Sequence, residues 1–523
     1  MGATRKGSNA LRRVWSLFLA ATIIAVMLAT VLPLSGCGTK TAFPVTAAEL
    51  DTARLKVNGY LTEKGRGLAA GRTRGATVYS MQLRLDTAGK TLSGNERVLY
   101  TNRSSDPLTE VVFRVYANDV AARGGGSPVT VNDLEADGRP ARHSLNGSIL
   151  HVALPSPLAP GKKTYLSFDF IEPVPSTEKS DGIFGCEGGT FDLGNFAPTV
   201  VMYSNGAWDN RSAPSYGDVM FYDCSYYFVS LEAPEDFVLA TTGTQTGSDG
   251  DRRIYSAGPV RDFEIQASDA YKSLSRKVGQ TTITSYYMGN EPVTGKAALD
   301  YGCTAFQLYS RHFGPYPYTR LNVCEAPLDD EGMEYTGQVQ IASSLYGDPK
   351  DVSDLEYTVA HEVCHQWWAL GVGSDSIDRA WQDESLTSYC ESLYTLWRYG
   401  EAAAKTYIQD YDVDGYLSSR EEGVPDGVVD QPMAAFLDGD QYTMLVYLKG
   451  ALFFDSLRNM KGGQSFDRSL AQYYRKNLFL NASPQDLISS FGANSSDPAS
   501  VNALYERWMH GVYGDADIKA QGN

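Results

Sequence analysis

The sequence feature that most constrains this chain is the segment His361-Glu362-Val363-Cys364-His365. In a helix, two histidines four residues apart project from the same face, about one turn apart. Two imidazoles at that separation can hold one zinc ion, and the glutamate between them can reach a water molecule on that ion. The alternative is a core helix that carries two ordinary histidines. Because the chain contains only six histidines, this spacing favours a zinc site.

A zinc ion held by two histidines takes a third ligand from a separate element, and a catalytic site leaves the fourth position for water. Glu384 suits this role because eighteen residues separate it from His365. That gap accommodates a helix end, a loop and the start of a second helix, which we predict over Asp383 to Tyr399. Structural zinc sites usually contain cysteine, so His361, His365 and Glu384 predict a catalytic centre. Glu391 lies on the same helix face and is either a partner for a ligand histidine or a surface carboxylate.

Composition narrows the class of protein and its partners. At 523 residues the chain is long enough for two or three domains, and 43% hydrophobic with 20% charged residues is typical of a folded protein. Thirty-three tyrosines and fifty glycines suit extensive β structure with many turns. The formal net charge of −17 argues against nucleic acid or an anionic lipid surface as a partner.

Residues 1–36 have the features of a targeting segment, because four basic residues precede an apolar stretch from Val14 to Leu34. The stretch ends in Leu34-Ser35-Gly36-Cys37, which resembles the lipobox of bacterial lipoproteins. The resemblance implies cleavage before Cys37, a lipid on Cys37, and attachment to the cell membrane outside the cytoplasm. The alternative is an uncleaved transmembrane anchor. Residues 37–75 are then predicted to form a tether with little fixed structure.

The remaining chain divides into a β-rich and a mainly helical part. Over residues 76–271, alternating and β-branched runs between turns predict a large antiparallel β-sheet domain. Val78 to Leu85 alternates most clearly, with its odd-numbered residues from Tyr79 on one face. Residues 272–523 are predicted to be mainly helical, with helices at Lys296 to Phe313 and Tyr442 to Met460. The fold class is therefore a multidomain α+β protein, with the zinc site in the second domain.

Three motifs, in order along the chain, resemble the M1 family of zinc metallopeptidases. The first is the HExxH segment followed after eighteen residues by Glu384. Gly332-Met333-Glu334-Tyr335 resembles the GxMEN motif of that family, and Tyr447-Leu448-Lys449-Gly450-Ala451 resembles its Y-x-K-G-A segment. The resemblance covers roughly residues 76 to 515. It implies a thermolysin-like catalytic domain over residues 272–523.

The resemblance also implies a role for each site residue. Zinc would be held by the triad above and would activate a water molecule, while Glu362 takes the proton and passes it to the leaving amine. Tyr447 would stabilise the oxyanion, and Glu334 would hold the free α-amino group of the substrate. The expected function is an extracytoplasmic zinc aminopeptidase acting on peptides with a free N-terminus. The alternatives are a zinc endopeptidase with an open site and a non-catalytic, peptide-binding surface lipoprotein.

The chain departs from the family pattern at several positions. Tyr335 stands where the family has Asn, and Asp383 and Ser385 flank Glu384 where Asn and Gly are common. Each change is expected to affect the geometry of the substrate pocket. Too few residues follow the last motif for the large C-terminal helical domain that many members carry, which favours a more open site.

Two further patterns concern a second metal and the cysteines. Asp410 to Glu421 matches the EF-hand calcium loop position by position, although a connector between helices is the alternative. Outside the cytoplasm disulfides are allowed, and Cys186 with Cys224 is the pair we expect first. Cys364 and Cys390 lie on the two ligand helices, where they are either close together or separately buried.

Overall fold

The chain is seen here in a computed structural model that describes residues 43–57, 59–176, 182–214, 216–219, 221–289, 292–347 and 353–521. The predicted signal segment 1–36 and the lipidation residue Cys37 lie outside the described residues. Within them, no helix has both the length and the apolar character needed to cross a membrane. All the described residues belong to one compact unit.

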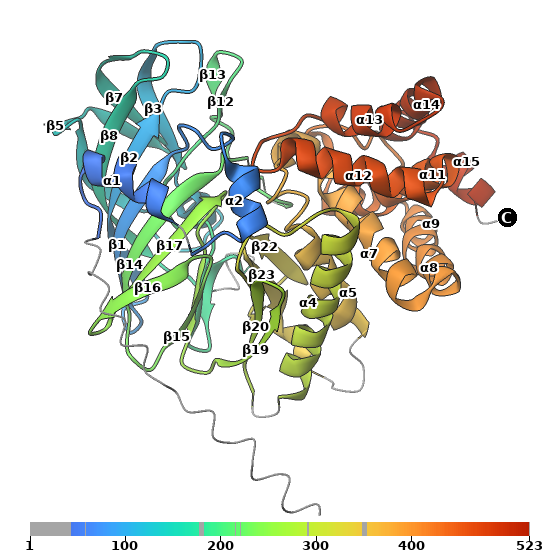
Figure 1. The fold of residues 1–523 in the computed structure, drawn as a ribbon, viewed down its shortest axis with the longest axis horizontal. Helices are drawn as coiled ribbons and strands as arrows, with labels where there is room; N and C mark the ends of the chain where they lie inside the picture. The colour runs from blue at the N-terminus through green and yellow to red at the C-terminus, as the bar shows by residue number, and fades with distance from the viewer. Residues whose placement is uncertain are drawn as a thin grey trace, which may run out of the picture. The chain divides into compact units, whose positions relative to one another are not determined.

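The tether predicted for residues 37–75 is folded from Phe43 onward. This segment forms α1 (Ala47–Ala53), the 3₁₀ turn η1 (Arg54–Lys56) and α2 (Glu63–Ala69) (Figure 1). Leu50 of α1 is fully buried against Val78, Leu99 and Phe228, and Ala47 and Ala53 pack against the same cluster, so an apolar face holds this helix in place. The prediction of little fixed structure is therefore wrong for this part of the segment.

An eight-stranded sheet forms the larger part of the β region (Figure 1). Its strands, in spatial order, are β16 (Thr244–Asp249), β17 (Arg252–Val260), β14 (Ser225–Glu232), β1 (Val78–Asp86), β2 (Thr91–Thr101), β8 (Lys163–Pro173), β4 (Thr130–Ala136) and β5 (Arg139–Pro140). Neighbouring strands are antiparallel except β1 and β14. The predicted inward face of β1 is confirmed, because Tyr79, Met81, Leu83 and Leu85 are all buried.

Three smaller sheets complete the β region. One contains β11 (Thr199–Val200), β3 (Leu108–Arg114), β7 (Ile149–Leu158) and β6 (His143–Asn146), and a second contains β15 (Val238–Thr241), β18 (Ile265–Ser268), β10 (Thr190–Leu193) and β9 (Phe184–Glu187). The third is the β12 (Tyr203–Ser204) and β13 (Ala207–Trp208) hairpin, and α3 (Tyr116–Ala122) follows β3. Cys186 of β9 and Cys224 are both free and buried, so the expected disulfide between them is not formed.

A five-stranded mixed sheet begins the second part of the chain. Its order is β19 (Lys272–Val278), β20 (Thr281–Tyr287), β21 (Arg320–Ala326), β23 (Gln338–Ala342) and β22 (Gly332–Tyr335), and the 3₁₀ turn η3 (Ser343–Tyr346) follows β23. The helices α4 (Val293–His312) and α5 (Ser353–Cys364) lie beside this sheet (Figure 1). Strand β22, which carries the GxMEN-like motif, is the edge of the sheet and packs against α5.

The rest of the chain is helical, so the predicted fold class is confirmed: a β-sheet region followed by a mainly helical one. Its α-helices are α6 (Ser376–Arg379), α7 (Glu384–Tyr399), α8 (Glu401–Tyr407), α9 (Asp414–Glu421), α10 (Gly439–Thr443), α11 (Gly450–Lys461), α12 (Gly463–Asn477), α13 (Pro484–Ala493), α14 (Pro498–Met509) and α15 (Gly514–Gln521). Two 3₁₀ turns, η4 (Ala380–Gln382) and η6 (Met433–Ala435), and two π-helical segments, η5 (Ile408–Val413) and η7 (Met444–Lys449), lie between them.

The calcium loop predicted over Asp410 to Glu421 is not formed. These residues continue through η5 into α9 without the loop that must wrap around the ion. Asp412 is buried while Asp410 and Asp414 are exposed, so the three carboxylates do not converge. Among the described residues, the groups that could hold a metal do not include any member of this segment.

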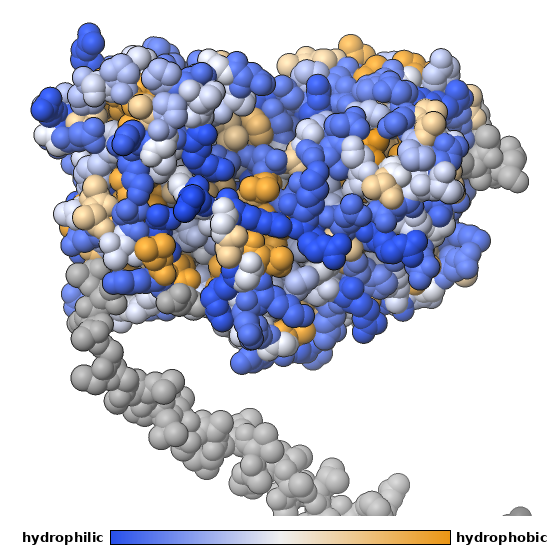
Figure 2. Space-filling model, turned by 45° about the horizontal axis from the view of Figure 1, so that its top comes forward, coloured by the Kyte–Doolittle hydropathy of each residue, from blue (hydrophilic) through white to orange (hydrophobic). Residues whose placement is uncertain are grey.

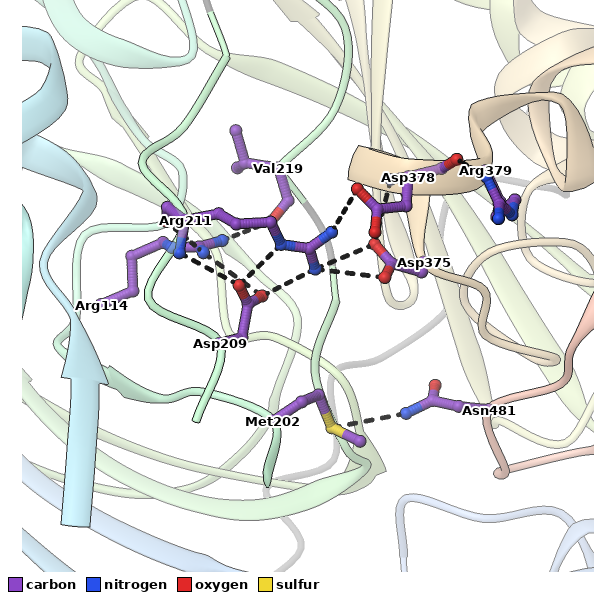
Figure 3. A network of polar contacts seen from close by, with 9 residues as sticks. All are labelled: Arg114, Met202, Asp209, Arg211, Val219, Asp375, Asp378, Arg379 and Asn481. Atoms are coloured by element: carbon purple, nitrogen blue, oxygen red, sulfur yellow. Dashed lines mark hydrogen bonds and ion pairs between the residues drawn. The ribbon is translucent and has the colours of Figure 1, made fainter. Parts of the chain in front are cut away.

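A network of ion pairs joins the β region to the helical region (Figure 3). The guanidinium of Arg211 contacts Asp209 in the β region and both Asp375 and Asp378 at α6. Buried Arg114 of β3 adds a second contact to Asp209. These ion pairs therefore hold the loop after β13 next to the start of the helical region.

The face of the molecule in Figure 2 is mostly hydrophilic, with hydrophobic residues in scattered patches.

Candidate metal centre and active site

The end of α5 and the start of α7 bring the three predicted zinc ligands together. His361 lies in α5, His365 directly follows its last residue Cys364, and Glu384 begins α7. The Nε2 atoms of His361 and His365 lie 3.1 Å apart. The Oε2 atom of Glu384 lies 3.3 Å from the first and 3.6 Å from the second. His365 and Glu384 are buried, and His361 is nearly so. Three donor atoms, from the end of α5 and the start of α7, therefore converge on one point inside the protein.

The spacing of these atoms fits a tetrahedral zinc ion. Zinc–ligand bonds of about 2.0–2.1 Å at tetrahedral angles put neighbouring ligand atoms roughly 3.3 Å apart. The three observed separations, from 3.1 to 3.6 Å, bracket that value. Oε2 of Glu384 is buried and has no hydrogen-bond donor, which a metal ion would remedy. The donor set of two imidazoles and one carboxylate is that of a catalytic zinc site.

A second layer of contacts orients these ligands. Oε1 of Glu391 lies 2.8 Å from Nδ1 of His361, and Oε2 accepts a hydrogen bond of 2.5 Å from the hydroxyl of Tyr407. Of the two interpretations for Glu391, the structure shows a partner for His361, one of the predicted ligands, not a free surface carboxylate. Asp383 caps α7 by accepting from the backbone N–H of Glu384 at 2.9 Å. The residue before the ligand therefore fixes where the ligand helix begins.

Glu362 lies beside the triad and close to the strand β22. The Oε1 atom would be 2.4 Å from a Cβ added at Gly332, so the carboxylate occupies the space that this glycine leaves. Oε2 of Glu362 is buried without a hydrogen-bond partner. Burial raises the pKa of Glu362 to about 8. A carboxylate with a pKa near neutral suits a group that must take up and then return a proton.

Two further carboxylates share the centre. One oxygen each of Asp218, Glu334 and Glu384 lies within 4.8 Å of the others, and all three residues are buried. Oε1 of Glu334 also lies 3.9 Å from Nδ1 of His365. Burial, and then the charges of nearby carboxylates, raise the pKa values of both Asp218 and Glu334 well above their usual range. Carboxylates this close are stable only where some of them take up a proton or a positive charge lies among them.

Asp218 is a functional candidate that the sequence did not reveal. It follows Gly217 in the segment between β13 and β14, which carries no recognisable motif. The Arg211 network of Figure 3 holds this segment against α6, close to the start of α7. The β region therefore supplies a wall of the candidate site.

Tyr447 lies beside the triad, in the π-helical segment η7. Its ring centroid is 6.2 Å from that of His361 and 5.7 Å from that of Tyr442. Lys449, two residues on, is buried and binds the carboxylate of Asp426 at 2.8 Å, which anchors the segment. π-Helical turns inside helices often occur at functional sites. Here the wider turn brings Tyr447 beside the ligand histidine.

The departures at Tyr335 and Ser385 lie away from the cavity. Strand alternation turns Glu334 toward the triad and Tyr335 to the other face, where Tyr335 is fully buried with Leu370. Ser385 faces Gly450 of α11, and its hydroxyl donates to the carbonyl of Val446 at 2.5 Å. Neither side chain lines the cavity of about 820 Å³ that contains the triad. The two substitutions are therefore structural.

Comparison with known proteins finds relatives for the part of the chain that carries this site. Residues 297–508 match the model of the peptidase family M1 domain. The matched residues include Glu334, the HExxH segment, Glu384 and Tyr447. Aminopeptidase M1 of Arabidopsis thaliana is 29% identical over 223 residues, which are 41% of this chain and 25% of that protein. Endoplasmic reticulum aminopeptidase 1 of Rattus norvegicus is 25% identical over 42% of this chain and 24% of that protein.

Solved structures extend the likeness beyond the M1 domain. A mutant M1 zinc metallopeptidase of Deinococcus radiodurans, bound to a Tyr-Ser-Ala substrate, has a TM-score of 0.62 at 17% identity, over 84% of this chain and 95% of that one. A two-domain M1 zinc metallopeptidase mutant bound to L-arginine has a TM-score of 0.61 at 16% identity. These structures share the fold of the β region and the M1 domain together. By contrast, the chain spans about a quarter of the length of the curated relatives that it matches.

Proposed function

We propose that this protein is a zinc-dependent aminopeptidase that removes N-terminal residues from peptides. The observation that carries the proposal is that Glu334, Glu362 and His365 each place one ligand-type atom within 4.8 Å of the other two. A carboxylate for the substrate ammonium therefore lies next to the general base and the metal centre. Such a distance leaves room for one residue before the scissile bond. Peptides with a free N-terminus are the substrates that this arrangement fits.

Each residue of the site has a separate role in the proposed reaction. Zinc held by the triad would supply a Lewis acid for the scissile carbonyl and for water. Glu362 takes a proton from the attacking water and delivers it to the leaving amine. The hydroxyl of Tyr447 donates to the oxygen that becomes negative as the bond breaks. Glu334 and Asp218 bind the substrate ammonium, whose charge offsets the repulsion between the buried carboxylates.

The test is an aminopeptidase assay on wild type and Glu362→Gln. The amide keeps the shape of the side chain but cannot accept the proton, so we expect kcat to fall by about 10²–10⁴ with one zinc ion per chain retained. Metal analysis and hydrolysis of alanine p-nitroanilide measure the two effects. An active Glu362→Gln variant would rule out the general-base role.

Peptides with free and acetylated N-termini distinguish the aminopeptidase from an endopeptidase with the same chemistry. The ammonium of the free peptide pairs with Glu334 and Asp218, so we expect acetylation to abolish turnover. Equal turnover of both peptides would refute the role of these carboxylates. Zinc-loaded protein with no turnover of either peptide would favour a binding protein instead.

We further propose that the enzyme works outside the cytoplasm, attached to the membrane through a lipid on Cys37. The proposal rests on the apolar stretch of residues 14–34 and on the small residues before Cys37. Cell fractionation of wild type and Cys37→Ala tests it. We expect the variant to leave the membrane fraction, and membrane retention of an unlipidated variant would favour an uncleaved anchor.

A further inference from the structure

Strand β22 indicates the direction in which a bound peptide runs through the cavity. Glu334 near one end of the strand marks the position of the substrate ammonium, and Gly332, two residues earlier, contacts Glu362 and marks the scissile bond. Continuing in the same direction leads to Asp330 and Glu331, which line the cavity just before the strand. Residues of the substrate that follow the scissile bond therefore lie on this side of the cavity.

The first turns of α5 lie on the same side. The hydroxyl of Thr358 donates to Oε2 of Glu331 at 3.3 Å, which joins this helix to the residues before β22. Asp354 and Tyr357, one to two turns before His361, also line the cavity. The cavity wall beside the residues that follow the scissile bond therefore consists of carboxylates and an aromatic ring.

The π-helical segment η5 completes this wall with aromatic rings. The ring centroid of Tyr357 lies 4.7 Å from that of Tyr407 and 5.8 Å from that of Tyr411. Tyr407 and Tyr411 are stacked at 4.5 Å. Tyr411 is 46% exposed even though its neighbours are aromatic. An exposed tyrosine ring in a cavity offers a face on which a cation can bind.

Asp412 is the second, independent sign of a ligand on this side. It is only 4% exposed, it lines the cavity, and its Oδ2 has no hydrogen-bond partner. Burial, and then the charge of Glu391, disfavour its ionised form. Leaving a carboxylate buried and unpaired is unfavourable, and a positively charged group from a substrate would satisfy it. Neither the zinc triad nor the catalytic residues use Asp412.

We propose that Asp354, Tyr357, Tyr411 and Asp412 form a subsite for a cationic side chain of the residue that follows the scissile bond. The inference rests on the proposed aminopeptidase function and names its preferred substrates, which are peptides with lysine or arginine in the second position. The carboxylates pair with the side-chain charge, and the tyrosine rings pack against its methylene groups and its cation. The formal net charge of −17 attracts such peptides to the protein.

Four substrates with the same first residue test the subsite: alanine p-nitroanilide, Ala-Lys-Ala, Ala-Ala-Ala and Ala-Glu-Ala. We expect kcat/KM for the lysine peptide to exceed that for the glutamate peptide at least ten-fold at low salt. The ratio is expected to shrink as salt is added, because the interaction is between charges. If the anilide is hydrolysed but the two peptides differ less than two-fold, the subsite is refuted while the proposed function stands. No hydrolysis of the anilide by zinc-loaded enzyme refutes the proposed function itself.

Variants locate the effect on the named residues. Asp412→Asn and Asp354→Asn are each expected to lower the lysine-to-glutamate ratio at least three-fold. Asp354 is exposed, so its variant remains informative if the buried Asp412→Asn protein does not fold. Asp410→Asn is the matched control, since this carboxylate is exposed on the same segment and does not line the cavity. A loss of the ratio in Asp410→Asn equal to that in the other two variants would overturn the assignment.

Discussion

At Gly332, adding one methyl group is expected to lower the catalytic rate while leaving the folded protein intact. In Gly332→Ala the new Cβ would lie 2.4 Å from Oε1 and 2.7 Å from both Cδ and Cγ of Glu362. Ordinary contacts begin near 3.4 Å, so the carboxylate must retreat by about 1 Å. Gly332 does not have a positive φ, so its backbone tolerates alanine. The perturbation therefore falls on the general base alone.

The expected loss follows from that displacement. A shift of about 1 Å in a catalytic group lowers the rate by roughly 10²-fold, and complete loss of a general base lowers it by about 10²–10⁴. We expect kcat/KM for alanine p-nitroanilide to fall by about 10² or more in Gly332→Ala. Zinc content and the melting temperature are expected to remain near wild type, because a flexible carboxylate yields more easily than backbone.

Gly347→Ala is the matched control, because Gly347 has a helical φ of −72° and its added Cβ would meet only an ordinary contact at 3.5 Å. A double mutant with Glu362→Gln tests the route of the effect, since a change that acts through Glu362 adds little once Glu362 is disabled. Near wild-type kcat in Gly332→Ala would refute the reasoning. Additive losses in the double mutant would show that the methyl group acts on substrate binding instead.

Two further predictions concern the partly buried Glu391 and the buried Glu96. In Glu391→Gln the partner of His361 loses its charge, and we expect zinc affinity to fall 10–100-fold in competition with a chelator; unchanged affinity would make the contact incidental. In the β region, burial raises the pKa of Glu96 well above its ordinary value. The unfolded chain then releases this proton above about pH 4.3 while the folded protein keeps it, so stability falls as pH rises, by up to about 1.4 kcal/mol per unit. Urea unfolding between pH 6 and 8 measures this. The free energy of unfolding is expected to fall less steeply with pH in Glu96→Gln than in wild type, and equal slopes would contradict the raised pKa of Glu96.

The sequence predicted the parts of the site that depend on local spacing. His361 of α5 and His365, directly after the last residue of α5, keep the predicted spacing, and α7 begins at Glu384, one residue after the predicted start at Asp383. Those relations follow from helix geometry, which is the same wherever the helix lies. The fold class followed in the same way from alternation in strands such as β1 and from apolar helical runs.

The remaining features depend on contacts that spacing does not encode. Asp218 comes from a segment without a motif, and only tertiary structure brings it to Glu384. The Asp410 to Glu421 pattern matched a calcium loop, yet packing of Val413 and Tyr416 keeps the segment helical. The disulfide between Cys186 and Cys224 was predicted only because both cysteines lie in the β region. Membership of one region does not show how far apart their sulfur atoms are.

The contribution of Asp218 has a consequence for how the site forms. The metal triad is closed by chain loops of three and eighteen residues, whereas Asp218 joins Glu384 across more than 160 residues. The entropy lost on closing a loop grows with its length, so the short loops are the easier ones to close. Metal capture is therefore expected to come first during folding, and the contribution of Asp218 later, when the two regions dock. A newly made chain would pass through a state that holds zinc and carries Glu334 but does not yet have the second carboxylate for the substrate amine.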